Sequence, residues 1–130
     1  MAVTAGEVAD AASKEWRLID ARAPERFRGE VEPIDKVAGH IPGAINVPFL
    51  DNLDANGTFK SADALAARFH EAVGSTPPDH IVVYCGSGVT ACQNLLAMEH
   101  AGMHGARLYA GSWSEWSSDP TRPTTTSKQK

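Results

Sequence analysis

The chain has 130 residues, 42% hydrophobic and 22% charged, with a formal net charge of −4, which fits one globular domain. The negative charge does not favour nucleic-acid binding. No apolar run reaches the ~20 residues of a membrane span, and the N-terminus lacks the basic start and apolar core of a secretory signal.

The first half of the chain predicts two strands and two short helical segments. Thr4 and Glu7 have the spacing of a capping box, which predicts a helix to about Ser13. Residues 17–20 predict a short strand, which Asp20 ends at the carboxyl edge of the sheet. Pro24 suits the first turn of a helix over residues 24–27, and residues 44–48 predict a second strand.

The second half predicts a capped helix, two strands and a polar end. Ser61 is placed to cap a helix from Ala62 to Val73, and Gly74 is placed to end it. Strands are predicted at residues 81–84 and 107–110, and a final helical turn after Gly111. Residues 119–130 lack apolar anchors other than proline, so we expect a polar, mobile tail after a domain of residues 1–118.

The stretch from Ile81 to Met98 carries the chemistry. A β-branched strand ends in Cys85, a loop with two glycines follows, and apolar residues then recur at helical spacing from Thr90 onward. That spacing places Cys92 on the inner face of the helix. Gly86 and Gly88 allow positive φ, so loop amides are expected to form an anion nest at the helix N-terminus. Such a nest favours the thiolate form of Cys85 over the thiol.

These elements predict an α/β fold with a small parallel sheet of four to five strands and helices on both faces. The two cysteines are seven residues apart, on a loop and on the helix behind it. That separation does not suit a disulfide. Reduced thiols therefore indicate a cytoplasmic protein.

Two reactions suit a cysteine held as an anion beside backbone amides. A cysteine phosphatase or arsenate reductase needs an arginine six residues after the cysteine to bind its oxyanion. That position is Ala91, and no arginine lies between Tyr84 and Ala106. The other reaction is sulfur transfer through a cysteine persulfide, which requires no metal and no organic cofactor.

The chain resembles the rhodanese family, in particular the C-terminal catalytic domain of two-domain thiosulfate or 3-mercaptopyruvate sulfurtransferases. The resemblance runs from about Leu18 to Pro120. It is carried by five segments in the family's order: Ile19-Asp20-Ala21-Arg22, Arg26-Phe27-Arg28-Gly29, Gly39-His40-Ile41-Pro42-Gly43-Ala44, Cys85-Gly86-Ser87-Gly88-Val89-Thr90-Ala91 and Gly111-Ser112-Trp113-Ser114-Glu115-Trp116.

The resemblance implies that Cys85 takes sulfane sulfur from a small donor and passes it to cyanide or a thiol. It implies an active-site loop made of Gly86, Ser87, Gly88, Val89 and Thr90. Arg26 and Arg28 would bind the donor, with pairing to Glu30 or Asp20 as the alternative for Arg28. Ser87 would either relay protons or hold the loop, and Asp20 and His40 would be structural.

The resemblance leaves the donor open. Gly86-Ser87 matches members that prefer 3-mercaptopyruvate, although many bacterial proteins with this loop are called thiosulfate sulfurtransferases. A non-catalytic sulfur carrier or interaction domain is the alternative. An N-terminal rhodanese-like domain, absent from this chain, is a further expected partner, whereas nucleic acid and membrane are not.

Overall fold

The sheet has five parallel strands in the order β1-β5-β4-β2-β3, in a computed structural model that describes residues 2–11, 15–32, 37–86 and 90–126. This confirms the predicted α/β fold. The strands are β1 (Ala2–Val3), β2 (Arg17–Asp20), β3 (Ile45–Asn46), β4 (Ile81–Tyr84) and β5 (Arg107–Tyr109). Strand β1 was not among the predicted strands, because two residues are too few to show periodicity.

Helices connect the strands, and their ends follow from local sequence. They are α1 (Ala5–Ala9), α2 (Pro24–Phe27), α3 (Ala62–Val73), α4 (Ala91–His100) and α5 (Ser112–Ser117), with 3₁₀ turns η1 (Phe49–Asn52) and η2 (Pro78–His80). The capping box of Thr4 and Glu7 is present, although α1 ends before Ser13. The Ser61 side chain accepts a hydrogen bond from Ala64, and α3 ends at Gly74 with φ 64°, so both predicted helix signals are confirmed.

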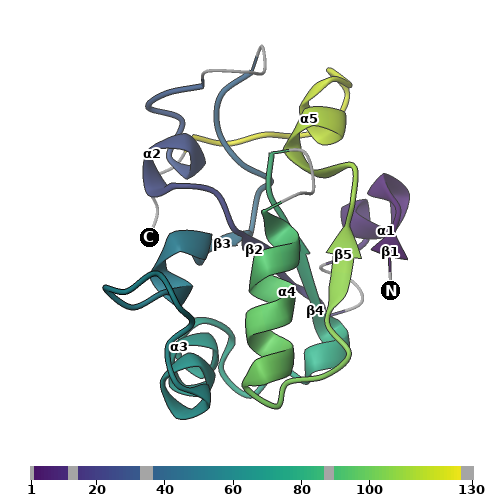
Figure 1. Ribbon diagram of the computed structural model, residues 1–130. Helices are drawn as coiled ribbons and strands as arrows, with labels where there is room; N and C mark the ends of the chain where they lie inside the picture. Colours follow the sequence, from purple (N-terminus) through teal and green to yellow (C-terminus); the bar gives the residue numbers. More distant parts are fainter. Residues whose placement is uncertain (1, 12–14, 33–36, 87–89, 127–130) are drawn as a thin grey trace.

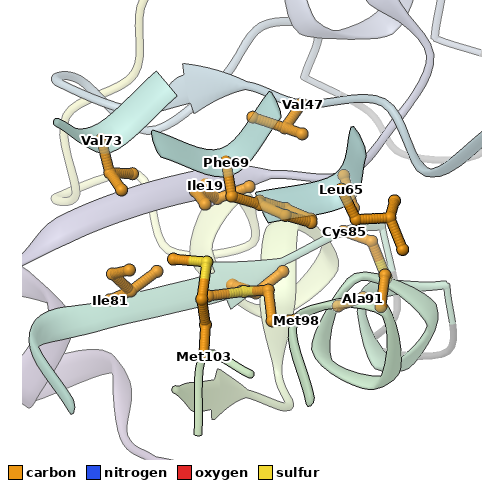
Figure 2. Packing of buried hydrophobic residues seen from close by; sticks show 13 residues of the cluster. Ile19, Val47, Leu65, Phe69, Val73, Ile81, Cys85, Ala91, Met98 and Met103 are labelled. Atoms are coloured by element: carbon orange, nitrogen blue, oxygen red, sulfur yellow. The ribbon is translucent and has the colours of Figure 1, made fainter. Parts of the chain in front are cut away.

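Alternate residues of β4 point to opposite faces of the sheet, and each face has its own core. Ile81, Val83 and the following Cys85 pack in a cluster with residues of α3 and α4, several of which are labelled in Figure 2. Val82 and Tyr84 pack in a second cluster with residues of α1 and α5. Figure 1 shows α4 in front of β4, with α1 beside β1. Since both faces are covered, every β4 side chain is buried.

The inner face of α4 differs from the predicted one. Cys92 is exposed and Leu96 is 59% exposed, so the prediction that Cys92 is a core residue is wrong. Asn94 is fully buried instead. Its amide donates to the Val47 carbonyl at 2.9 Å and its oxygen accepts from Asn52 at 2.5 Å. These bonds satisfy a polar residue inside the core, and they turn Cys92 toward solvent.

The segment after α5 lies against the domain as far as residue 126. In Figure 1 it crosses from α5 toward α2. Thr125 exchanges two backbone hydrogen bonds with His40, at 2.8 and 3.0 Å, and the Trp116 indole donates to the Pro123 carbonyl at 2.8 Å. The expectation of a mobile tail took no account of these bonds, since hydrogen bonds between backbone groups leave no sequence signal. Residues 127–130 lie outside the described residues.

Candidate active site

Cys85 follows β4 directly, at the carboxyl edge of the sheet, and its backbone is held by the start of α5. The Cys85 amide donates to the Ser112 hydroxyl at 3.1 Å, and the Cys85 carbonyl accepts from the Trp113 amide at 2.9 Å. The next carbonyl, that of Gly86, accepts from the Ser114 amide at 2.8 Å. Three consecutive residues of the final helix thus fix the first two residues of the cysteine loop.

Ser112 has a backbone conformation that is uncommon for its residue type. Its φ is 56°, and the side chain is fully buried, an arrangement that costs energy and tends to persist where surrounding contacts enforce it. The Ser112 hydroxyl accepts from Cys85 and donates to the Tyr109 carbonyl at 2.7 Å. Ser112 was predicted only as part of a helical turn, because a contact with a residue 27 positions away along the chain has no local signal.

The Arg26 guanidinium lies over Gly86. A Cβ placed on Gly86 would come within 3.2 Å of Arg26 Nη2 and 3.4 Å of Nη1, so the absent side chain leaves the space that the guanidinium occupies. Gly86 itself is not among the glycines with positive φ. The prediction of positive φ at Gly86 is therefore wrong, and its role is the close approach of Arg26. A cation from α2 thus lies next to the residue that follows Cys85.

Two buried carboxylates organise the arginines beside this site. Asp20 accepts from the Arg22 backbone amide and from its guanidinium, with the shortest contact, 2.7 Å, to Nη2. Burial opposes the charge of Arg22, but the bond and charge of Asp20 prevail and raise its pKa. Glu32, whose side chain is 5% exposed, accepts from Arg26 Nη2 at 3.0 Å and lies 3.5 Å from Arg22 Nη1. Asp20 is therefore structural, as the resemblance implied, and Glu32 was missed.

Arg28 contacts a different carboxylate. Its guanidinium forms two hydrogen bonds to Glu30, at 3.0 and 3.1 Å, and both side chains are exposed. Such exposed pairs contribute little to stability. Of the two arginines, Arg26 is the one whose guanidinium lies over Gly86, the described residue of the loop next to Cys85.

The middle of the predicted loop, Ser87, Gly88 and Val89, lies outside the described residues. The parts on either side are described: Gly86 beneath Arg26, and Thr90 just before α4 in helical conformation, with φ −76°. Ala91, where a phosphatase would need arginine, is fully buried. Cys85 is 1% exposed and packs near Leu65 and Ala91 (Figure 2), which favours small reactants over bulky ones.

His40 is a packing residue. It is fully buried, its ring stacks on Phe27 at 3.7 Å, and Nδ1 lies 2.6 Å from the Phe27 carbonyl. Burial lowers the pKa of His40 despite this bond. Across the described part of the chain, no group of three or more His, Cys, Asp or Glu side chains is placed to hold a metal ion, and no helix is long and apolar enough to cross a membrane.

A hollow of about 700 Å³ lies on the side of the sheet that α1 covers, away from Cys85. Its lining includes Arg17 and Leu18 at the start of β2 and His80 just before β4. These residues belong to the amino edge of the sheet, whereas Cys85 follows the carboxyl edge. The hollow and Cys85 thus lie at opposite edges of the sheet.

The chain matches the family model of the rhodanese-like domain over residues 4–119. It is 59% identical over 109 residues to a protein named "Probable 3-mercaptopyruvate sulfurtransferase" from Pseudomonas aeruginosa. The matched region covers 84% of this chain and 38% of that protein. It is 43% identical over 107 residues to human 3-mercaptopyruvate sulfurtransferase, covering 80% and 35% respectively. The chain thus spans little more than a third of the length of these relatives.

Solved structures extend the likeness to the fold. The anaerobic ergothioneine biosynthesis enzyme from Chlorobium limicola, in complex with trimethyl histidine, superimposes with a TM-score of 0.87 at 25% identity. The superposition covers 98% of this chain and 32% of that one. A structure of EanB with a cysteine persulfide, in a tetrahedral intermediate state with ergothioneine, gives the same TM-score, identity and coverage.

Proposed function

Since this chain belongs to the rhodanese family, we propose that it is a sulfurtransferase in which Cys85 carries the transferred sulfur as a persulfide. The observation that carries the proposal is the placement of Cys85 directly after β4, with the Arg26 guanidinium over the next residue. The proposed nucleophile and a cation for an anionic donor are thus separated by a single residue position, Gly86. The sulfurtransferase names of the relatives and the persulfide in EanB support the same chemistry.

In the first step, the Cys85 thiolate attacks the sulfane sulfur of the donor. With thiosulfate, the new S–S bond forms as the bond between the two donor sulfurs breaks, and sulfite leaves with its electron pair. With 3-mercaptopyruvate, the C–S bond breaks and the thiol proton passes to C3, so pyruvate leaves. Either reaction gives a Cys85 persulfide anion with no external oxidant or reductant.

In the second step, an acceptor takes the outer sulfur. Cyanide attacks it and leaves as thiocyanate, and the S–S bond electrons return to Cys85 as thiolate. The N-terminal end of α4, which begins at Ala91, carries a partial positive charge that would stabilise the persulfide anion. Arg26 orients the donor through charge-assisted hydrogen bonds. The free thiolate that this chemistry needs fits a reducing compartment such as the cytoplasm.

The burial of Cys85 supports small donors. A side chain that is 1% exposed is reached more readily by thiosulfate or 3-mercaptopyruvate than by a residue on a protein surface. We therefore favour turnover with small molecules over a role as a passive sulfur carrier. The donor is assigned to Arg26, because its guanidinium lies over Gly86, the residue that follows Cys85.

The test is a thiocyanate assay with each donor and cyanide, on the wild-type chain, Cys85→Ala and Cys92→Ala. Cys85→Ala should reduce transfer to the uncatalysed background. Cys92→Ala removes the exposed thiol and should stay within about twofold of wild type, as expected when an exposed side chain is replaced. Equal rates for wild type and Cys85→Ala would rule out the proposal.

A further inference from the structure

The segment after α5 is attached to the helix that holds the cysteine loop. We call residues 119–126 the strap, and they lie almost wholly beyond residues 4–119, which the family model matches. The Trp116 indole of α5 donates to the Pro123 carbonyl of the strap at 2.8 Å. The first residues of the same helix hold the backbone of Cys85. The near end of the strap is thus fixed to the element that fixes the proposed nucleophile.

The far end of the strap reaches the residues around α2, as Figure 1 shows. Thr125 and His40 exchange two backbone hydrogen bonds, at 2.8 and 3.0 Å. The buried His40 ring stacks on Phe27 with 3.7 Å between the ring centres, and its Nδ1 lies 2.6 Å from the Phe27 carbonyl. Phe27 directly follows Arg26 in α2. The strap is therefore joined through His40 to the neighbour of the cation in the site.

Two glycines leave the space in which the strap lies. Gly29 has φ 80° and Gly39 has φ 124°. A Cβ on Gly29 would come within 2.7 Å of Thr126 Cγ2 and 3.0 Å of Thr126 Cβ, and a Cβ on Gly39 would collide with the Thr125 carbonyl oxygen. The strap thus approaches the backbone more closely than any residue other than glycine permits. The Gly29 amide donates to the Arg26 carbonyl at 3.1 Å, so this second contact also lies beside Arg26.

The strap therefore links the two helices between which the site is built, since α5 holds the Cys85 backbone and α2 carries Arg26. We infer that the strap is a positioning segment, which through Thr125 and Thr126 holds the Arg26 guanidinium in register with the cysteine loop. This inference rests on the proposed function, in which Arg26 orients the donor. The strap acts through Arg26, and a displacement of about 1 Å in such a group is enough to slow a reaction by about 100-fold.

The first test loosens the strap in the full chain. Thr125→Pro removes the N–H that donates to the His40 carbonyl. Thr124→Pro is the matched control, because Thr124 is exposed and lies outside this pair of bonds. In a transfer with two steps, kcat/KM for the donor reports sulfur uptake by Cys85, and kcat/KM for cyanide reports sulfur release.

Thr125→Pro should lower kcat/KM for the donor about tenfold or more, because the position of Arg26 is lost, and should leave kcat/KM for cyanide within about twofold of wild type. Thr124→Pro should leave both within about twofold. A strap that only stabilises the fold would lower both values by the same factor, since it would change the fraction of folded protein. That result, or equal effects of the two proline variants, would overturn the inference.

The second test uses the glycine contact. Gly29→Ala places a methyl group against Thr126, and Gly57→Ala is its control, since Gly57 has φ 82° and nothing lies within 4 Å of its Cβ position. Gly29→Ala should lower kcat/KM for the donor about tenfold, and Gly57→Ala should leave it within about twofold. Adding Thr126→Gly to Gly29→Ala removes the collision and should restore it to within about threefold of wild type. A loss that persists in the double variant would show that backbone strain at residue 29 is the cause, and would overturn the inference.

Hydrogen exchange separates this inference from the proposed function, because it does not depend on sulfur transfer. The amides of residues 26–29 should exchange about tenfold faster in Thr125→Pro than in Thr124→Pro, and the amides of α3 should exchange equally in both. Equal exchange of residues 26–29 would overturn the inference. The predicted exchange in a chain that transfers no sulfur would count against the proposed function alone.

Discussion

Replacement of Ser112 by alanine removes the hydroxyl that joins the Cys85 amide to the Tyr109 carbonyl. Both hydrogen bonds are buried, at 3.1 and 2.7 Å. The Cys85 N–H then faces a methyl group and has lost its acceptor. A buried donor left without a partner costs about 1–3 kcal/mol, so we expect the free energy of unfolding to fall by that amount.

A second variant separates the hydrogen bonds from the backbone strain at φ 56°. Ser112→Gly loses the same hydroxyl, but glycine adopts positive φ without the steric cost that a Cβ imposes. That cost is about 1–2 kcal/mol for an L-residue in the left-handed region. Ser112→Gly should therefore be more stable than Ser112→Ala by about 1 kcal/mol, although glycine usually destabilises a helix relative to alanine.

Urea unfolding and the thiocyanate assay together test this reasoning. Ser117→Ala is the control, because its hydroxyl donates to the Trp113 carbonyl one turn earlier in the same helix, and its loss should cost less than about 0.5 kcal/mol. Sulfur transfer should fall roughly tenfold or more in both Ser112 variants, since the Cys85 backbone is no longer fixed. The reasoning is refuted if Ser112→Ala is as stable as Ser117→Ala, or if Ser112→Gly is the less stable of the two.

Three further predictions concern the donor, α4 and pH. Arg26→Ala should lower kcat/KM for an anionic donor about 10- to 100-fold through loss of a charge-assisted bond. Arg28→Ala should lower it less than about threefold, because it is the Arg26 guanidinium that lies over Gly86, and equal losses in the two variants would contradict the assignment of the donor to Arg26. Urea unfolding should show that Asn94→Ala lowers the free energy of unfolding by about 2 kcal/mol. Leu96 is 59% exposed, so Leu96→Ala should lower it by less than about 0.5 kcal/mol. The reverse order would mean that α4 buries the face that carries Leu96 and not the face that carries Asn94. Burial lowers the pKa of His40 below its ordinary 6.5, so the unfolded chain binds the proton more readily than the folded one. The free energy of unfolding should therefore fall as the pH drops below about 6.5. If its dependence on pH is the same in His40→Gln as in wild type, His40 is not the cause.

The parts of the fold that follow from local signals could be predicted from the sequence. The apolar run of β4, the capped and glycine-terminated α3 and the capping box of α1 each depend on residues within a few positions of one another. Periodicity and capping rules report on that range. Cys85 was identified for the same reason, since the strand, loop and helix around it are contiguous in the chain.

The parts that depend on distant residues could not be predicted. The inner face of α4 is set by the buried amide of Asn94, which pairs with Asn52 from η1. The spacing of the apolar residues alone therefore predicted the wrong buried face. The Ser112 hydroxyl accepts a hydrogen bond from the Cys85 amide, 27 residues earlier in the chain. Glu32 binds Arg26 from an irregular segment that has no periodicity. Each of these contacts is a tertiary property that local pattern does not encode.

The most direct test of the account is the mass of the cysteine peptide after treatment with donor. No lysine or arginine lies between Arg68 and Arg107, so one tryptic peptide contains both Cys85 and Cys92, and the experiment is done on wild type, Cys92→Ala and Cys85→Ala. We predict one added sulfur atom on wild type and on Cys92→Ala, lost again on addition of cyanide, and none on Cys85→Ala. Sulfur added equally to Cys85→Ala, or no addition to wild type with either donor, would contradict the central claim that Cys85 carries the transferred sulfur.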